Sequence, residues 1–351
     1  MVRRSFLSCA VIVLLAVCGP LPASEDDLRP QLLQDELYTE GWDYYFLFDD
    51  GTWVTVQTFI SNFGPGNHRG LVIGTITKAD DESIVIKNGR PREKWQFSES
   101  GYDFKLARHH LMGEFPDYRL RLRNRRGELE IDLTATAPPW RPMTGQVSEE
   151  RHYVSMFLTQ LRAEGRYRSG GDGDAEAPWR RLQGGVGYAV RYLNAKSLSK
   201  VASGWLRLAP WQAEGDDKPL LLLLTQPDGQ QTNHMALLTG DVIRWQGSGF
   251  SVSYEEAVSM VPNGHLIPQT ISLDVEHGGT SISGTVRVRQ LLQRFDFVGE
   301  LKNLERIFVR FINTPIHYRY LADYDFQVRD SGGVRRLTGS GFAEYMTLKY
   351  Q

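Results

Sequence analysis

The sequence GWDYYFLF at positions 41–48 decides the class of fold. Alternate residues of a β-strand lie on the same face, so Trp42, Tyr44 and Phe46 share one face while Asp43 and Tyr45 share the other. Both faces carry large aromatic side chains, and each therefore needs an apolar partner. We expect one face to line a β-barrel and the other to be covered by a second barrel packed against the first.

Short segments rich in β-branched and aromatic residues recur along the chain, for example at positions 53–60, 71–77, 118–123 and 281–288. Glycine, aspartate and asparagine clusters separate them, and four of these are typical of hairpin turns: positions 49–51, 88–89, 126–127 and 227–229. This spacing predicts an all-β protein with antiparallel strands. The only helix that we expect is a short one within positions 27–38.

The chain also contains an internal repeat. Gly41-Trp42 recurs 163 residues later as Gly204-Trp205, and His152-Tyr153 recurs as His317-Tyr318. The run RRLQG at 180–184 likewise recurs as RRLTG at 335–339. The order of these landmarks indicates a duplicated unit of about 160 residues, the size of one eight-stranded barrel. We therefore predict two domains, residues 24–196 and 197–351, with Trp42 and Trp205 filling the two barrel floors.

Residues 1–23 have the features of a secretory signal peptide. Arg3 and Arg4 precede an apolar run at positions 6–17, which is too short to cross a bilayer comfortably, and Ala23 suits cleavage. We expect export to the periplasm or the extracellular space. An alternative is lipoprotein processing at Cys18, which would anchor the chain to a membrane.

Composition limits the chemistry of the mature chain. Both cysteines, Cys9 and Cys18, lie in the signal segment, so cleavage after Ala23 leaves no thiol for disulfides, nucleophiles or thiolate metal sites. His109 and His110 are adjacent, so their rings point to opposite faces of a strand and cannot share a metal. A formal net charge of −2 gives no signal for nucleic-acid binding. We predict neither a metal nor a cofactor.

Four features in order along the chain resemble the tandem lipocalin-like superfamily, which includes AttH-type proteins, carotenoid 1,2-hydratases, survival-factor proteins and some pericyclases. They are GWDYY at 41–45, IDLT at 131–134 leading to PPW at 138–140, GGVGY at 184–188 and GSGFAEY at 339–345. The resemblance implies two lipocalin-like barrels in tandem. It also implies an Asp-His pair near the pocket, in the place where this chain has Val190-Arg191.

Two carboxylates are candidate catalytic acids. Asp43 lies on an aromatic strand, where burial would raise its pKa, although an aspartate at the rim facing water is the alternative. Glu344 lies on an otherwise apolar segment, at the place that Val190 occupies in the first half. An ion pair with Arg191 or Arg310 is the favoured reading of Glu344, because an unpaired buried carboxylate is costly.

The candidate ligand contacts are polar or aromatic residues on the strands that would line the first barrel or its border with the second. A neutral amide in an apolar pocket orients a ligand, although it also satisfies backbone groups. The candidates are Tyr44, Gln57, Asn62, His110, His152, Tyr153, Tyr188 and Arg191.

The sequence favours an exported protein that binds a lipid, a terpenoid or a polyketide-like molecule within a barrel or between the barrels. The first alternative is a cofactor-independent hydratase, isomerase or cyclase that uses Asp43 or Glu344 as its acid. The second is a structural envelope protein without a ligand. The sequence does not predict the oligomeric state.

Overall fold

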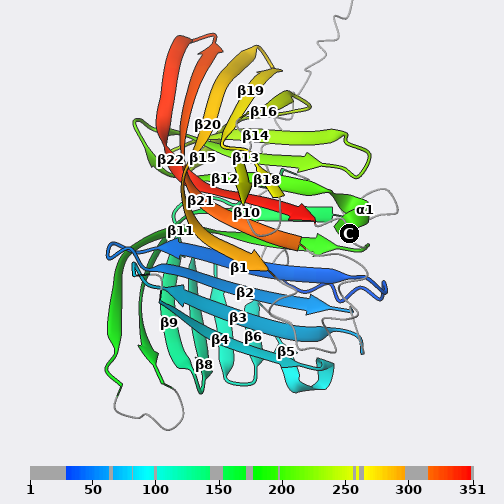
Figure 1. Cartoon of the computed structure of the whole chain (residues 1–351), viewed down its shortest axis with the longest axis vertical. Coiled ribbons are helices and arrows are strands. Elements are labelled where there is room, and N and C mark those ends of the chain that lie inside the picture. Colours follow the sequence, from blue (N-terminus) through cyan, green and yellow to red (C-terminus); the bar gives the residue numbers. More distant parts are fainter. Residues whose placement is uncertain are drawn as a thin grey trace, which may run out of the picture.

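The computed structural model describes residues 29–62, 66–80, 82–98, 101–142, 153–170, 177–196, 198–255, 258–260, 265–296 and 315–348. These residues form two large antiparallel sheets and one small two-stranded sheet (Figure 1). The first large sheet is a nearly closed barrel and the second is curled, so the predicted all-β architecture of two packed barrels is confirmed. Within the described residues, no helix has the length and hydropathy needed to cross a membrane.

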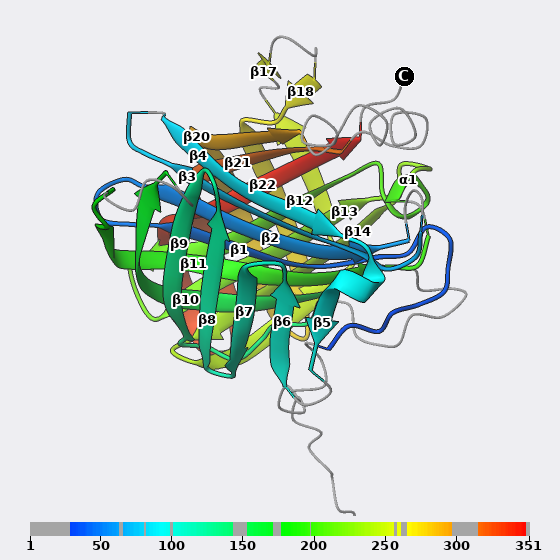
Figure 2. The same cartoon turned by 90° about the horizontal axis from the view of Figure 1, so that it is seen from below.

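The first barrel is an eleven-stranded sheet in which the strand order is β4-β3-β2-β1-β11-β10-β9-β8-β7-β6-β5. Its first and last strands, β1 and β11, are neighbours, and β4 packs across the barrel against β6, β8 and β9 (Figure 2). A short 3-10 helix, Arg92–Lys94, precedes β5. The strands are β1 (Thr39–Leu47), β2 (Trp53–Ser61), β3 (Arg69–Thr77), β4 (Ser83–Arg90), β5 (Trp95–Phe97), β6 (Tyr102–Leu106), β7 (His109–Glu114), β8 (Asp117–Asn124), β9 (Gly127–Ala135), β10 (Tyr153–Ser169) and β11 (Arg180–Asn194).

The second barrel is a nine-stranded sheet in which β12 and β22, its first and last strands, are also neighbours. The helix α1 (Leu198–Val201) separates it from the first, and β17 (Val258–Met260) and β18 (His265–Ile267) form the small sheet. The strands of the nine-stranded sheet are β12 (Gly204–Ala213), β13 (Asp217–Thr225), β14 (Gln231–Thr239), β15 (Val242–Ser248), β16 (Ser251–Glu255), β19 (Thr270–His277), β20 (Thr280–Asp296), β21 (Pro315–Asp330) and β22 (Gly333–Leu348).

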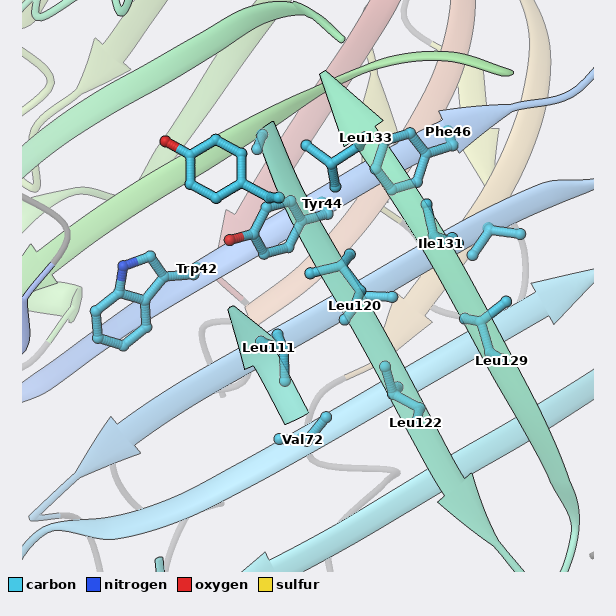
Figure 3. Close-up of a cluster of buried hydrophobic side chains, with 14 of the residues drawn as sticks. Trp42, Tyr44, Phe46, Val72, Leu111, Leu120, Leu122, Leu129, Ile131 and Leu133 are labelled. Carbon is cyan, nitrogen blue, oxygen red and sulfur yellow. The ribbon is translucent and has the colours of Figure 1, made fainter. Parts of the chain in front are cut away.

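Large apolar side chains fill the interior of the first barrel. Trp42, Tyr44 and Phe46 point inward from β1 toward leucine and isoleucine side chains of β7, β8 and β9, such as Leu120 and Ile131 (Figure 3). All of these side chains are buried. The alternation predicted for β1 is therefore present, and Trp42 belongs to the barrel core as expected.

The expected role of Trp205 is wrong. In β12 the residues that enter the core of the second barrel are Leu206 and Leu208, whereas Trp205 packs outside that core against Leu224 and Met346. A one-residue shift along a strand exchanges its faces, because the side-chain period is two. When the two Gly-Trp pairs are aligned, the inward-facing positions of β12 are therefore shifted by one residue from those of β1. As a result Arg207 faces outward from its barrel, as Asp43 does in β1.

Residues 29–38, the N-terminal cap segment, pack against the first barrel core through Leu32 and Leu33 and form no helix. Asn62 explains part of this difference, because its Nδ2 donates to the carbonyl oxygens of Leu33 and Asp35, each at 2.8 Å. The Asn62 side chain thus occupies both carbonyls, and the backbone N–H that bonds to Asp35, that of Tyr38 at 3.0 Å, closes a turn of three residues rather than a helical turn of four. The expected helix is wrong over the described part of this range.

Three of the four expected turns connect consecutive strands. Gly51 and Gly229 adopt positive φ angles of 78° and 86° in two of them, a conformation that favours glycine. The turn expected at positions 88–89 is wrong, because β4 runs through both residues and Gly89 pairs with Leu71 of β3.

Candidate functional site

The outer face of the first barrel is covered by the second barrel, as the two aromatic faces of β1 predict. We call this contact the junction. Its buried apolar residues come from β1, β2, β10, β11 and the β9–β10 connection on one side and from β12, β13, β14, β21 and β22 on the other. They are Tyr45, Trp53, Trp140, Phe157, Tyr188, Val190, Ala209, Leu220, Leu222, Ala236, Leu321 and Phe342.

Asp43 is buried at the junction, with 2% of its surface exposed. Its Oδ2 accepts hydrogen bonds from the Tyr45 hydroxyl at 2.9 Å and from Nε2 of Gln57 at 3.4 Å. Among the described residues, none donates to its Oδ1. Burial raises the pKa of Asp43 to about 6, because the nearby Arg319 charge offsets only part of the lost hydration. The carboxyl group can therefore hold or release a proton near neutral pH.

Arg319 of β21 connects the two barrels. Its Nη2 donates to the Tyr45 hydroxyl at 3.2 Å, and its guanidinium lies 4.6 Å from the centre of the Tyr45 ring. Its Nη1 donates to Oε1 of Gln293 at 2.6 Å, and this oxygen also accepts from Nε1 of Trp53. The first barrel thus contributes the acid and the phenol, and the second contributes the cation that orients the phenol.

Glu344 of β22 is the buried anion of the junction. His317 lies 2.9 Å from its Oε1, Arg207 lies 3.5 Å from the same oxygen, and Arg319 lies 3.4 Å from its Oε2. Burial acts to raise the pKa of Glu344, but His317, Arg319 and Arg207 together hold it well below its ordinary value. Glu344 is therefore ionised at neutral pH and has no proton to donate.

The favoured expectation for Glu344, an ion pair with an arginine, is confirmed, but the expected partners are not the observed ones. Arg191 extends from the other face of β11 and pairs with buried Glu40, whose second oxygen accepts from Tyr38 at 2.5 Å. Arg310 lies outside the described residues. The register of β22 explains the actual partners, because Glu344 pairs directly with Arg207 of β12 and with Arg319 of β21.

Aromatic rings lie beside this polar cluster. The Tyr45 ring lies 4.7 Å from Tyr188 and 6.3 Å from Trp53, measured between ring centres. On the opposite side of the junction, Phe342 lies 5.5 Å from Trp53 and 5.4 Å from half-buried Trp211. The junction therefore combines an aromatic wall with a group of charged and hydrogen-bonding side chains.

Several candidate ligand contacts lie elsewhere. Tyr44 points into the first barrel (Figure 3), and its hydroxyl group bonds to that of Tyr102. Asn62 holds the N-terminal cap segment, and its Oδ1 also accepts from the His68 amide at 2.8 Å. His110 pairs with Asp103 at the surface. The side chains of these three residues therefore do not lie at the junction with Asp43.

The two remaining candidates are His152 and Tyr153, the pair that recurs in the second half as His317-Tyr318. His152 lies outside the described residues. Tyr153 begins β10, but its side chain is not among those described. Of the ten candidates, the structure brings Asp43, Gln57, Tyr188 and Glu344 together at the junction.

Sequence reasoning missed most of the groups that surround Asp43. Arg207, Gln293 and Arg319 carried no motif, and His317 was singled out only as the repeat partner of His152. The available signal was alternation in β21, where His317, Arg319 and Leu321 occupy every second position. No group of three or more histidine, cysteine or acidic side chains suited to a metal occurs among the described residues.

Solved structures with a similar arrangement support the fold. A kievitone hydratase from Nectria haematococca gives a TM-score of 0.54 at 10% identity, over 88% of each chain. An AttH-type protein from Nitrosomonas europaea gives 0.58 at 13% identity, over 90% of this chain and 93% of that one. CghA in complex with Sch210972 gives 0.60 at 12% identity, over 90% and 89%. The chain has the tandem lipocalin-like fold.

The tandem lipocalin-like chain resembles known proteins in structure but not detectably in sequence. Neither a protein-family model nor a curated protein sequence gives a significant match. Where the superfamily resemblance implies an Asp-His pair, Val190 faces the junction and Arg191 points away from it. Val190 pairs directly with Asp43 of the neighbouring strand, so a carboxyl group is present at this place but comes from β1.

Proposed function

We propose that this chain is an exported protein that binds a lipophilic or amphipathic small molecule at the junction between its two barrels. The observation that carries this proposal is the environment of Asp43. Its buried carboxyl group lies beside an aromatic wall, and its Oδ1 bonds to none of the described residues. An apolar ligand surface would contact the rings, and its burial would stabilise the complex by about 25 cal/mol per Å² of apolar area removed from water. A polar ligand group would bond to Asp43 or Gln57.

Tryptophan fluorescence tests this location, because Trp53 lies at the junction while Trp42 lies inside the first barrel. The probe is the neutral lipophilic dye N-phenyl-1-naphthylamine, titrated into the full chain. We expect Trp53→Phe to weaken energy transfer to the dye and Trp42→Phe to leave it nearly unchanged. The reverse pattern would place the dye in the barrel, and a protein that excludes the dye would overturn the proposal.

Native mass spectrometry after mild purification tests for the natural ligand. We expect a species heavier than the apoprotein that releases a lipophilic compound on denaturation. Chains that are all free of ligand, from a preparation kept in its own host and away from detergent, would contradict the binding role.

Export is part of the proposal and rests on residues 1–23. The intact mass of the protein recovered from its host distinguishes the two routes of processing. A chain that begins at Ser24 fits signal-peptide cleavage, whereas an acylated chain that begins at Cys18 fits a membrane-anchored lipoprotein. A chain recovered with residues 1–23 in place would contradict both.

The second candidate function is cofactor-independent acid catalysis on the bound molecule, as in a hydratase, an isomerase or a cyclase. Asp43 favours it, because its pKa of about 6 suits proton transfer near neutral pH. Glu344 would act by fixing the charges around Asp43. One of the structural neighbours is itself called a hydratase, kievitone hydratase.

Isotope incorporation tests the catalytic candidate even while the substrate is unidentified. The protein is incubated with a lipophilic extract of its host in D2O enriched in oxygen-18, and the products are analysed by mass spectrometry. A hydratase introduces both isotopes, and an isomerase introduces deuterium alone. We expect Asp43→Asn to abolish incorporation while it preserves dye binding; equal incorporation by this variant would exclude Asp43 as the acid.

A further inference from the structure

We propose that His317, oriented by Glu344, is the proton acceptor that works opposite Asp43 at the junction. This inference rests on the catalytic candidate described above and adds the second proton-transfer group that such a reaction needs. His317 comes from β21 of the second barrel, whereas Asp43 comes from β1 of the first.

The hydrogen bond to Glu344 determines which nitrogen of His317 is basic. Nδ1 of His317 lies 2.9 Å from Oε1 of Glu344, and an ionised carboxylate only accepts hydrogen bonds. Nδ1 therefore carries the proton, and Nε2 keeps its lone pair. Among the described residues, Nε2 makes no hydrogen bond, and 12% of the His317 side chain is exposed.

The surroundings of His317 hold the ring in place and keep it neutral. Its ring is packed edge-on between Trp205 and Phe295, with ring centres 5.8 Å and 6.2 Å away. Burial lowers the pKa of His317, and the positive charges of Arg319 and Arg207 act in the same direction, against the Glu344 carboxylate. A neutral imidazole with a free Nε2 is a competent base at neutral pH.

The charges around Glu344 argue against a role for His317 that is limited to neutralising this carboxylate. Arg207 and Arg319 already lie within 3.5 Å of Glu344, so its charge is matched without the imidazole. With Asp43 protonated, the cluster carries one net positive charge from two arginines and one glutamate. Such a cluster stabilises negative charge that develops on an oxygen atom. The substrate class that fits is a lipophilic molecule with a double bond conjugated to a carbonyl or phenolic oxygen.

The proton transfers balance for the addition of water to such a double bond. The oxygen of water forms the new C–O bond, and one of its protons passes to Nε2 of His317. The proton of the Asp43 carboxyl group forms the new C–H bond. The resulting imidazolium loses its proton to solvent and the Asp43 carboxylate regains one, which restores both groups.

Nitrogen-15 NMR of histidine-labelled protein tests the tautomer without any substitution. At neutral pH we expect His317 to be neutral with the proton on Nδ1. His109 is an internal control, because its Nδ1 accepts from the Arg123 amide at 3.2 Å and burial lowers its pKa to about 4. It should therefore show the opposite tautomer, with the proton on Nε2. A His317 ring that is charged, or protonated on Nε2, would overturn the proposal.

A lipophilic base-sensitive probe, 5-nitrobenzisoxazole, tests whether Nε2 acts as a base. A base removes its C3 proton, the N–O bond breaks, and a coloured cyanophenolate forms. We expect the full chain to exceed buffer, and His317→Gln to lose at least tenfold while surface variant His110→Gln keeps the rate. No rate above buffer, or a rate lost only in Asp43→Asn, would overturn the role of His317.

Dye binding separates this inference from the proposed function. A protein that binds N-phenyl-1-naphthylamine through Trp53 but fails both His317 tests retains the binding role and loses the proposed base. A protein that shows the expected tautomer but excludes the dye retains the dyad and loses the proposed ligand site. Near-ultraviolet circular dichroism of His317→Gln confirms that the variant is folded.

Discussion

Tyr45 on the first barrel accepts a hydrogen bond from Arg319 on the second, at 3.2 Å, and donates its own proton to Asp43 at 2.9 Å. One hydroxyl group thus links the charges of the second barrel to the acid of the first. The link crosses 274 residues of sequence, and it gives the two halves a shared electrostatic site rather than two separate ones.

Substitution of Tyr45 by phenylalanine should destabilise the protein by roughly 1–3 kcal/mol, because it removes a buried partner from both Asp43 and Arg319. The pKa of Asp43 should rise further, since the hydroxyl bond lowers it. Tyr320→Phe is the matched control, because the buried Tyr320 hydroxyl bonds to none of the described residues. Equal stabilities of the two variants in chemical denaturation would contradict this assignment.

Asp43→Asn should change how stability depends on pH. The pKa of Asp43 is raised on folding, so its favourable contribution is complete below about pH 4 and is lost as the pH rises through about 6. Asp43→Asn should remove this loss, which amounts to roughly 3 kcal/mol for a shift of about two units. Denaturation from pH 4 to 8 measures it. Asp274→Asn, on the exposed face of β19, should keep the wild-type slope.

Asn62→Ala should loosen the N-terminal cap segment. The substitution removes two donors to backbone carbonyls and the acceptor for the His68 amide, at a cost of roughly 2–4 kcal/mol for several buried hydrogen bonds. Hydrogen exchange should become faster in residues 31–38. Asn124→Ala, at the end of β8, should leave that segment protected. Unchanged exchange in Asn62→Ala would show that the cap is held by its leucines alone.

Gly187→Ala should disrupt the pairing of β1 with β11. A Cβ atom at this position would lie 1.9 Å from the carbonyl oxygen of Tyr45, a backbone atom that cannot move without breaking the sheet. We expect a loss of more than roughly 3 kcal/mol or a failure to fold. Gly89→Ala should cost less than about 1 kcal/mol, because its nearest contact is 3.4 Å away on the Leu71 side chain. Comparable losses in urea denaturation would refute the steric argument.

The sequence predicts the architecture because its signals are local. Alternation in β1 identifies two apolar faces, and the repeat of Gly41-Trp42 at Gly204-Trp205 indicates two barrels. The same repeat misplaces Trp205, because sequence similarity does not record which of two opposite faces turns inward. Aromatic residues on both sides of a strand leave that choice to packing.

The site is only partly predictable for a related reason. Asp43 is identifiable as a carboxylate on an aromatic strand, but its neighbours Arg319 and His317 lie on a strand whose alternation resembles that of a solvent-exposed face. Only the first barrel, packed on that face, turns it into an interior. Contacts between distant halves leave no periodic signal in either half.

The order of strands in each sheet has a consequence for how the protein is made. In both barrels the first strand hydrogen-bonds to the last, β1 to β11 and β12 to β22, and these four strands contribute Asp43, Tyr188, Arg207 and Glu344. During synthesis, neither barrel can close until its final strand has emerged. The charged cluster therefore cannot form until β22, which carries Glu344, has been translated.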